Sequence, residues 1–448
     1  MHPRKPIPAF SQLAPAITPL GNSVSQGYPI SQGLFTSQGM LTSQALSARA
    51  TVRRAIARLL LVLSLLLLSS CVLPGVLPPE SIVTPTSTPL PPTITPTPTL
   101  TPTPLPTSTP TPTPTVPTYP NLVFISMKDG AIGWGLTEDL ILRTTDGGAQ
   151  WQYLVPAGMV LSDLPIRGFF LDANNGWVWV SNVPDGSRGL LYRTNDGGQS
   201  WQSAEVPLGS PYLQFVDALV GWAMWSPGAA AGSSTIELFR TTDGGATWEK
   251  VYALDPAKSG APGELPFSGQ KSGVTFIDKK HGWITGSQPT PGYAWLFETQ
   301  DSGKTWQPVD LTLPVGYETA QLTIDPPLFF SAQDGILPVT LITDKPVKVF
   351  FLTRNAGQTW KVFKPVDDGY YDFITFKEGW VWRGTVLYTT KDSGKNWASL
   401  TPNVDLSQVL VKLDFVTRDV GWALTMDLSG VSKLYKTPDG GATWTPLW

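Results

Sequence analysis

The chain has 448 residues and a nearly balanced charge, with 31 lysines and arginines against 34 aspartates and glutamates. This balance gives no electrostatic attraction toward nucleic acid, so we expect no nucleic-acid partner. A single cysteine excludes an intramolecular disulfide framework, and two histidines exclude a histidine-rich metal site. The 18 tryptophans and 42 glycines are typical of an aromatic β protein that is rich in turns.

Residues 1–39 are polar and of low complexity. The dipeptide Ser-Gln recurs every six residues, at Ser25, Ser31 and Ser37, and once more just beyond this segment at Ser43. Such a segment cannot bury a core. It is either a disordered arm or sequence upstream of a translation start at Met40, and we favour the second interpretation.

Residues 40–70 have the organisation of an export signal. Four arginines precede an apolar run, and they are Arg49, Arg53, Arg54 and Arg58. The run Leu59–Leu68 is much shorter than the ~20 residues that span a bilayer as a helix. It leads into Leu68-Ser69-Ser70-Cys71, which resembles the lipobox of bacterial lipoproteins. That resemblance implies cleavage before Cys71 and lipidation of its thiol; an ordinary signal with an incidental cysteine is the alternative.

Residues 71–118 are dominated by proline and threonine. Proline lacks an N–H donor and favours the extended polyproline II conformation, so this segment predicts a disordered linker rather than a core. The predicted order is therefore a lipid at Cys71, a spacer, and a globular domain at residues 119–448.

A nine-residue box occurs seven times in residues 119–448, first as Arg143–Trp151. Each copy has an acidic or amide residue, a glycine two positions later and a tryptophan five positions later. The acidic or amide residues are Asp146, Asp196, Asp243, Asp301, Asn355, Asp392 and Asp439. The tryptophans are Trp151, Trp201, Trp248, Trp306, Trp360, Trp397 and Trp444. We number the seven copies, and the repeats that contain them, from one to seven.

The chemistry of the box is that of a tight hairpin turn. We expect the Asp or Asn side chain to accept from a backbone N–H two residues on, and the glycine to supply a positive φ. The tryptophan supplies a ring that packs beneath the turn. We interpret the boxes as structural, because one turn supplies one carboxylate and separate repeats keep these carboxylates apart. The sequence thus predicts no catalytic residue, no metal site and no cofactor.

A Gly-Trp pair precedes six of the boxes, and its tryptophans are Trp134, Trp177, Trp222, Trp283, Trp380 and Trp422. Repeat five has Gly335-Ile336 instead and Asn355 in its box, so it departs from the pattern at both signatures. Each repeat fits four short strands, and four strands in ~40–50 residues is the period of a propeller blade. The sequence predicts an all-β, seven-bladed β-propeller of four-stranded antiparallel blades. We expect each blade to be contiguous in sequence, with the ring closed by packing.

The box Thr-x-Asp-Gly-Gly-x-Thr-Trp resembles the Asp-box, or bacterial neuraminidase repeat. Together with the Gly-Trp pair, it is similar to the photosystem II assembly/stability factor family, whose members are extracytoplasmic seven-bladed propellers. This resemblance implies a non-enzymatic scaffold that binds a protein or a glycan. With the lipobox, it indicates an exported monomer, anchored by lipid at the outer face of the cell membrane. Related repeats also occur outside photosynthesis, so the identity of the partner stays open.

Asp-boxes also occur in sialidases and xyloglucanases, so a carbohydrate-binding protein or a glycoside hydrolase is the alternative function. The nearest match to the sialidase signature Arg-Ile-Pro is Pro165-Ile166-Arg167, which is reversed. Xyloglucanases place paired carboxylates between two propellers, whereas this chain has room for one. The acid pair Asp367-Asp368 stands beside Gly369 and is expected in a solvated loop.

Long segments are predicted to lie together on the face opposite the box turns, around repeats two to five. They carry four aromatic residues that we expect to be exposed for partner contact, namely Trp225, Phe267, Tyr293 and Trp295. The segments Ser226–Glu237 and Ser287–Ala294 are expected to lie outside the strand ladder. The alternative is that these segments only cover their own blades.

Overall fold

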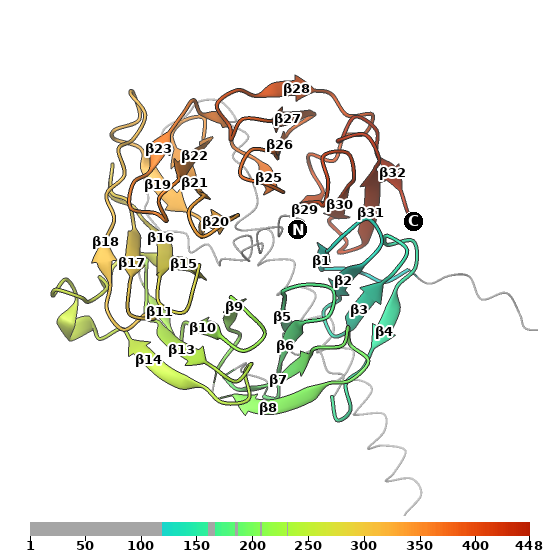
Figure 1. The fold of residues 1–448 in the computed structure, drawn as a ribbon. Helices are drawn as coiled ribbons and strands as arrows, with labels where there is room; N and C mark the ends of the chain where they lie inside the picture. Colours follow the sequence, from blue (N-terminus) through green and yellow to red (C-terminus); the bar gives the residue numbers. More distant parts are fainter. Residues whose placement is uncertain (1–118, 160–165, 184–186, 207, 231) are drawn as a thin grey trace, which may run out of the picture. The chain divides into compact units, whose positions relative to one another are not determined.

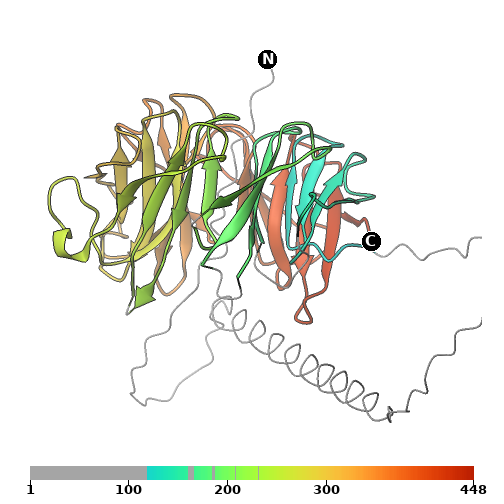
Figure 2. The ribbon, with the colours of Figure 1, turned by 90° about the horizontal axis from the view of Figure 1, so that it is seen from below.

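The computed structural model describes residues 119–159, 166–183, 187–206, 208–230 and 232–448. The predicted signal, lipobox and linker lie outside the described residues. In the described part, antiparallel sheets are arranged around a ring, and each sheet stands with one strand toward the centre (Figure 1). The strands run between two opposite faces of the ring, where the turns gather (Figure 2). No helix in these ranges is long and apolar enough to cross a bilayer.

The strands of each repeat follow one order. The first strand lies nearest the centre (Figure 1), and these are β1 (Phe124–Met127), β5 (Ile166–Phe170), β9 (Tyr212–Phe215), β15 (Gln270–Phe276), β20 (Leu328–Phe329), β25 (Tyr370–Phe373) and β29 (Leu410–Phe415). The second strand begins at the glycine of the Gly-Trp or Gly-Ile pair, and these are β2 (Gly133–Leu136), β6 (Gly176–Ser181), β10 (Gly221–Trp225), β16 (Gly282–Gln288), β21 (Gly335–Ile342), β26 (Gly379–Arg383) and β30 (Gly421–Met426).

The third and fourth strands flank the box. The third strands are β3 (Ile141–Thr144), β7 (Gly189–Thr194), β13 (Glu237–Thr241), β17 (Leu296–Thr299), β22 (Val347–Thr353), β27 (Val386–Thr390) and β31 (Ser432–Thr437). The fourth strands are β4 (Gln152–Leu154), β8 (Gln202–Val206), β14 (Glu249–Ala253), β18 (Gln307–Pro308), β23 (Lys361–Val362), β28 (Ala398–Leu400) and β32 (Thr445–Pro446). The additional elements are β11 (Ala229–Ala230), β12 (Ser233–Ser234), the 3-10 helix η1 (Pro256–Lys258), β19 (Gln321–Ile324) and β24 (Val366–Asp367).

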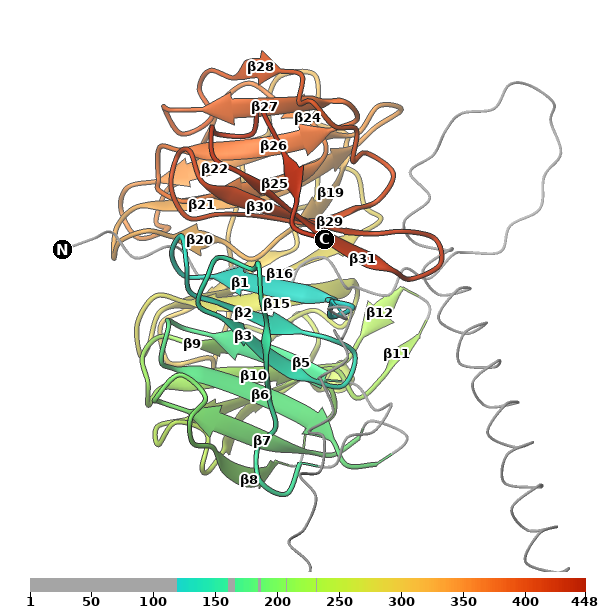
Figure 3. The ribbon, with the colours of Figure 1, turned by 90° about the vertical axis from the view of Figure 1, so that its right-hand side faces the viewer.

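Five repeats form separate four-stranded sheets, and repeats four and five share a ten-stranded sheet. The sharing arises because β19 pairs with both β16 and β21. Repeat one is β1–β4 and repeat seven is β29–β32, and these sheets lie side by side (Figure 3). The prediction that the terminal blades are contiguous in sequence is therefore confirmed.

Prolines interrupt the sheet of repeat five. Pro326 and Pro327 separate β19 from β20, and Pro365 precedes β24. Proline cannot donate to a strand ladder, so the first and the fourth strand of this repeat are each divided in two.

Each box closes its turn through the acidic or amide side chain. In box three, Asp243 Oδ1 accepts from the Thr241 hydroxyl at 2.8 Å and from the N–H of Thr247 at 2.9 Å. The Thr241 hydroxyl in turn accepts from the N–H of Gly245 at 2.8 Å, and Gly245 has a φ of 92°. Equivalent bonds occur in the other six boxes, with Asn355 as the acceptor in box five.

The expected position of the backbone donor was wrong. The donor to the Asp or Asn oxygen lies four residues on rather than two, as Thr247 does for Asp243. The reason is the pair of successive positive φ values, 74° at Gly244 and 92° at Gly245, which carry the chain around the carboxylate before it re-enters a strand.

We call the contact between the sheets of two consecutive repeats a joint. The tryptophan of the Gly-Trp pair packs in this joint. Trp222 of repeat three stacks on Phe276 of repeat four, with ring centres 3.7 Å apart. Gly282 lies under the same ring, and a Cβ there would stand 2.5 Å from Phe276. Glycine is thus required beside the stacked ring. Similar stacks join Trp134 to Phe170, Trp177 to Phe215, Trp283 to Phe329 and Trp380 to Phe415.

Indole N–H groups add a hydrogen bond to five joints. Trp134 donates to the carbonyl of Asp172, in the β5–β6 turn of repeat two, at 2.9 Å. The other four donate to a box carbonyl of the next repeat: Trp177 to Gly244 at 2.8 Å, Trp222 to Ser302 at 3.0 Å, Trp380 to Gly440 at 3.1 Å and Trp422 to Gly147 at 2.8 Å. The last of these joins repeat seven to repeat one. The Gly-Trp pair and the box are therefore two halves of one contact between repeats.

Candidate functional site

The first residue of the box covers the joint on the box-turn face, the face that carries the boxes and the turns between first and second strands. In joint one–two, Arg143 donates to the carbonyls of Ala173 at 2.6 Å and Gly197 at 2.8 Å, both in repeat two. Its guanidinium also lies 4.9 Å from the centre of the Trp134 ring. The arginine therefore spans from its own repeat to the next.

Basic residues do the same at two further joints. Arg193 donates to the carbonyl of Asp243 in box three. Lys436 donates to the carbonyl of Gly130 at 3.3 Å and lies 4.9 Å from the Trp422 ring centre. A long cationic side chain thus covers joints one–two, two–three and seven–one.

Repeat five lacks these groups. Its first box residue is Leu352, which has no donor, and Ile336 stands where other repeats have the stacking tryptophan. The sequence showed the departures at Ile336 and Asn355. The consequence of Leu352 was missed, although the basic residues at the start of boxes one, two, three and seven were visible as a signal.

In joint five–six, a larger core side chain fills the space of the missing tryptophan. Phe350 stands where the other repeats have a leucine or isoleucine, namely Ile141, Leu191, Leu238, Leu296, Leu387 and Leu434. The Phe350 ring lies 4.9 Å from Phe373 and 5.6 Å from Trp397. The apolar volume lost with the tryptophan is therefore restored, whereas the indole and guanidinium donors have no counterpart in Ile336 and Leu352.

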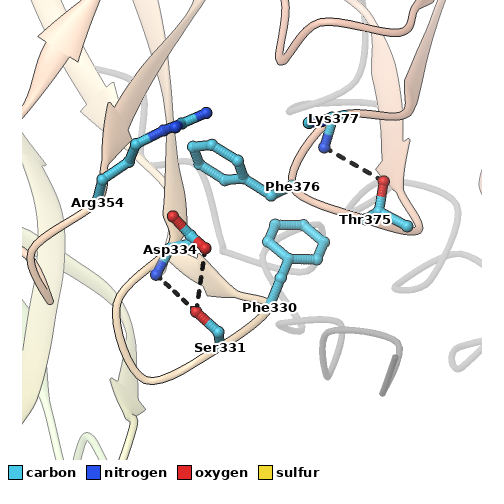
Figure 4. A pocket seen from close by; sticks show the side chains of 7 residues that line it. All are labelled: Phe330, Ser331, Asp334, Arg354, Thr375, Phe376 and Lys377. Carbon is cyan, nitrogen blue, oxygen red and sulfur yellow. Dashed lines mark hydrogen bonds between the residues drawn. The ribbon is translucent and has the colours of Figure 1, made fainter. Parts of the chain in front are cut away.

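A hollow of about 510 Å³ opens at this joint on the box-turn face (Figure 4). It is lined by Phe330, Ser331 and Asp334 from the β20–β21 turn, Arg354 from box five, and Thr375, Phe376 and Lys377 from the β25–β26 turn. Phe376 occupies the turn position that Ala173 holds in joint one–two. The hollow is thus bounded by the same turns that Arg143 bridges in the first joint.

The lining combines aromatic rings with cations. Phe330 and Phe376 contact edge to face with centres 6.4 Å apart, and the Arg354 guanidinium lies 5.2 Å from the Phe376 ring (Figure 4). Arg354 and Lys377 are exposed, and no described residue forms an ion pair with either. Asp334 accepts from the Ser331 hydroxyl at 3.3 Å. The hollow therefore offers an apolar floor with positive charge at its rim.

A second, smaller hollow of about 120 Å³ lies at joint six–seven, where the first box residue is Thr389. Arg418 lies beside it and pairs with Glu378 at 3.7 Å. Both hollows thus occur at joints whose box begins without a basic residue.

The aromatic residues predicted for partner contact fall into two separate clusters. Trp295 is fully buried, with 0% exposure, so the expectation that it is exposed was wrong. Its indole N–H donates to the carbonyl of Ser268 at 2.8 Å, and half-buried Phe267 and Tyr293 pack over the same core. Lys271 stands 5.0 Å from the Trp295 ring, and burial lowers its pKa to about 7. These aromatics therefore cover the core of repeats three and four.

Trp225 lies apart from them. It ends β10, is half-buried and packs against the core of repeats two and three. Between it and β13, the hairpin β11–β12 stands outside the main sheets (Figure 3). The expectation for Ser226–Glu237 was wrong at its end, because Glu237 begins β13 and pairs with Trp225. The expectation for Ser287–Ala294 was wrong at its start, because Ser287 and Gln288 extend β16 and pair with β19.

A buried polar cluster lies at the end of β22 remote from box five. Lys348 stands 3.3 Å from Asp368 and 3.7 Å from Asp325, which also accepts from the Tyr371 hydroxyl at 3.0 Å. Burial raises the pKa of Asp325. The expectation of a solvated loop for Asp367-Asp368 is met in part: Asp367 is exposed in β24, whereas Asp368, with a side chain 29% exposed, pairs with Lys348.

The box carboxylates have lowered pKa values, which do not suit a general acid. Hydrogen bonds from Ser200 hold the pKa of Asp196 at about 2. Burial raises the pKa of Asp243, but hydrogen bonds from Thr247 prevail and lower it to about 2. A general acid needs a pKa near the working pH, so these side chains act as turn acceptors. Among the residues described, no three Asp, Glu, His or Cys side chains gather as metal ligands would.

No protein-family model matches the chain. A xyloglucanase of Paenibacillus sp is 25% identical over 279 residues, covering 54% of this chain and 25% of that protein. The photosystem II assembly protein Ycf48 of Thermosynechococcus vestitus is 28% identical over 140 residues, covering 31% of this chain and 37% of that protein. The chain therefore spans well under half the length of these curated relatives. The solved structure of Ycf48 from Cyanidioschyzon merolae is 18% identical, covers 72% of this chain and 97% of that one, and has a TM-score of 0.48.

Proposed function

We propose that this chain is a non-enzymatic binding scaffold, built as a seven-bladed β-propeller of the Asp-box type. In this proposal the ten-stranded sheet counts as two blades, one for repeat four and one for repeat five, beside the five four-stranded sheets. The seven boxes and the repeated joint contacts support this count. The sequence similarity to a photosystem II assembly protein supports a protein as the partner.

The observation that carries the proposal is the hollow at joint five–six. Exposed Arg354 lies 5.2 Å from the Phe376 ring, and exposed Lys377 and Phe330 line the same hollow (Figure 4). Aromatic residues and arginine are enriched at the energetic centres of protein–protein contacts. The hollow is also the place where the repeat pattern is broken, so it marks one position on an otherwise repetitive ring.

The second candidate is a glycoside hydrolase or carbohydrate-binding protein, which the 279-residue match to a xyloglucanase favours. Such hydrolases need two carboxyl groups about 5–9.5 Å apart that face a cleft. Here Asp325 and Asp368 both bind Lys348, at 3.7 and 3.3 Å, and Asp325 is largely buried. The box carboxylates are held in their turns. These arrangements support binding over hydrolysis.

The proposal includes export and a lipid anchor at Cys71. The Pro/Thr-rich segment at residues 71–118 would then be a spacer of up to ~3.1 Å per residue, which holds the domain at residues 119–448 away from the outer face of the membrane. A monomer on such a spacer presents either face of its ring to a neighbouring protein.

Site-specific cross-linking in membranes of the source cells tests the proposal. A benzoylphenylalanine replaces Ser331 in the hollow or, as the control, Leu428, which is 82% exposed in the β30–β31 turn on the other face. We expect a cross-linked protein from position 331 and none from position 428. In parallel, the purified protein is incubated with xyloglucan and reducing ends are measured. Sugar release that disappears in Asp368→Asn would establish the hydrolase instead.

A further inference from the structure

We propose that the hollow at joint five–six binds an acidic peptide segment of the partner, in which a carboxylate side chain stands beside an aromatic or branched apolar one. The inference rests on the scaffold function proposed above and specifies the chemistry of its ligand. Two halves of the lining carry it.

The first half recognises the carboxylate. The Arg354 guanidinium carbon lies 5.2 Å from the centre of the Phe376 ring, and its N–H donors have no acceptor among the described residues. A guanidinium presents paired donors that match a carboxylate. Lys377 adds a second exposed cation, while Asp334 is the one carboxylate in the lining. The balance of charge therefore favours an anion over a cation.

The second half recognises an apolar side chain. Phe330 and Phe376 stand edge to face at 6.4 Å and form the floor of the hollow. The volume of about 510 Å³ lies within the ~300–1,000 Å³ of typical ligand pockets. It accommodates side chains together with the backbone between them.

The position of the hollow explains why this joint differs from the others. In joint one–two, Arg143 of the chain itself occupies the space between the box and the next turn, with bonds of 2.6 and 2.8 Å. In joint five–six, Leu352 leaves that space open, and Arg354 stands two positions further on. The Arg354 guanidinium is thus exposed at the surface, whereas the Arg143 guanidinium is bound to backbone carbonyls of the next repeat.

The hydroxyl groups of the lining favour a peptide over a sugar. The Ser331 hydroxyl already accepts from the N–H groups of Gln333 and Asp334, at 3.1 and 2.9 Å. The Thr375 hydroxyl accepts from the N–H groups of Lys377 and Glu378, at 3.2 and 3.0 Å. A sugar presents several hydroxyls that need partners, whereas Ser331 also donates to Asp334 and Thr375 has only its O–H left to offer.

Fluorescence anisotropy on the full-length protein in detergent tests this inference. The probe is the labelled, end-blocked peptide Glu-Phe-Glu-Leu-Glu, compared with Gln-Phe-Gln-Leu-Gln. We expect the wild type to bind the acidic peptide at least ~10-fold more tightly, as the loss of a charge-assisted hydrogen bond implies. Arg354→Gln should weaken binding of the acidic peptide by a similar factor. Gln300 holds this box position in repeat four, so the substitution suits the turn.

Two further variants make the test specific. Arg383→Gln removes an exposed arginine at the end of β26, away from the hollow, and should leave binding unchanged. Leu352→Arg restores the residue type of box one and should block the hollow. Equal binding by wild type and Arg354→Gln would overturn the inference, as would trigalacturonate binding that matches the peptide and depends on Arg354.

The outcome also separates this inference from the scaffold function. If the wild type ignores the acidic peptide while the Ser331 cross-link still forms, the ligand class is wrong and the scaffold function stands. Sugar release dependent on Asp368 would remove the scaffold function whatever the peptide does.

Discussion

The indole N–H of Trp422, in the last repeat, donates to the carbonyl of Gly147, in the first box, at 2.8 Å. The same bond joins Trp222 to Ser302 within the chain, at 3.0 Å. Closure of the ring therefore uses the contact that joins consecutive repeats, and the terminal sheets need not exchange strands. The ring closes because repeat seven and repeat one each carry one half of that contact.

Replacing Trp422 with phenylalanine should lower the free energy of unfolding by ~1 kcal/mol more than the same change at Trp283, because only Trp422 loses a hydrogen bond. The Trp283 indole nitrogen is buried without a hydrogen-bond partner among the described residues, so Trp283→Phe is the matched control. Urea unfolding of both variants measures the difference. Equal losses would mean that ring packing alone holds the joint.

The acceptor of a box turn should matter more than its charge. Asp243→Ala removes the oxygens that accept from Thr241 and Thr247 and should cost ~1–2 kcal/mol. Asp243→Asn should cost much less, since Asn355 accepts in box five at 2.9 and 3.0 Å. Peptide binding should be unaffected in both. If the two variants are equally unstable, the charge of the carboxylate is what the turn requires.

The box tryptophans should differ according to burial. Trp444 is 1% exposed and donates to the carbonyl of Gly441 at 2.9 Å, so Trp444→Ala should cost ~3–5 kcal/mol. Trp248 is half-buried, and its replacement should cost less. Thermal unfolding compares the two. A larger loss of stability at Trp248 would show that burial does not determine which tryptophan contributes more.

Acid should destabilise the domain through the boxes. The pKa of Asp196 and of Asp243 is about 2 in the fold, against an ordinary value of 3.8. A carboxyl whose pKa is lowered by folding stabilises the fold above its unfolded pKa, and this stabilisation is lost as the pH falls through the folded pKa. We expect the melting temperature to fall below pH ~4 and to keep falling toward pH ~2. Asp243→Asn should show a shallower fall; a wild-type melting temperature that stays constant down to pH ~2 would contradict this account.

The predicted anchor can be tested directly. Cys71→Ser should remove the lipid and leave the protein soluble or unprocessed, because the thiol is the atom that the lipid would modify. Mass spectrometry of protein extracted from membranes measures the modification and the first residue. Wild-type protein without lipid, or beginning upstream of Cys71, would exclude a lipoprotein.

The sequence by itself determined the all-β class, the four-strand repeat and the structural use of both signatures. Those features are local: a glycine beside a stacked ring, or a carboxylate within its own turn, leaves a mark at fixed spacing. Asp243 and Gly282 were informative for that reason. The face that carries the proposed ligand site could not be predicted from such local features. It depended on how turns from neighbouring repeats meet.

The tertiary structure decided which aromatics are covered and where the ring is open. Trp295 reads in sequence as a loop residue, yet folding of the preceding linker buries it completely. Leu352 reads as an ordinary strand residue, and the hollow beside its box appears only when turns of repeats five and six pack together. Spacing along one repeat fixes bonds within that repeat, whereas a site at a joint depends on side chains contributed by two repeats and on the volume they leave unfilled.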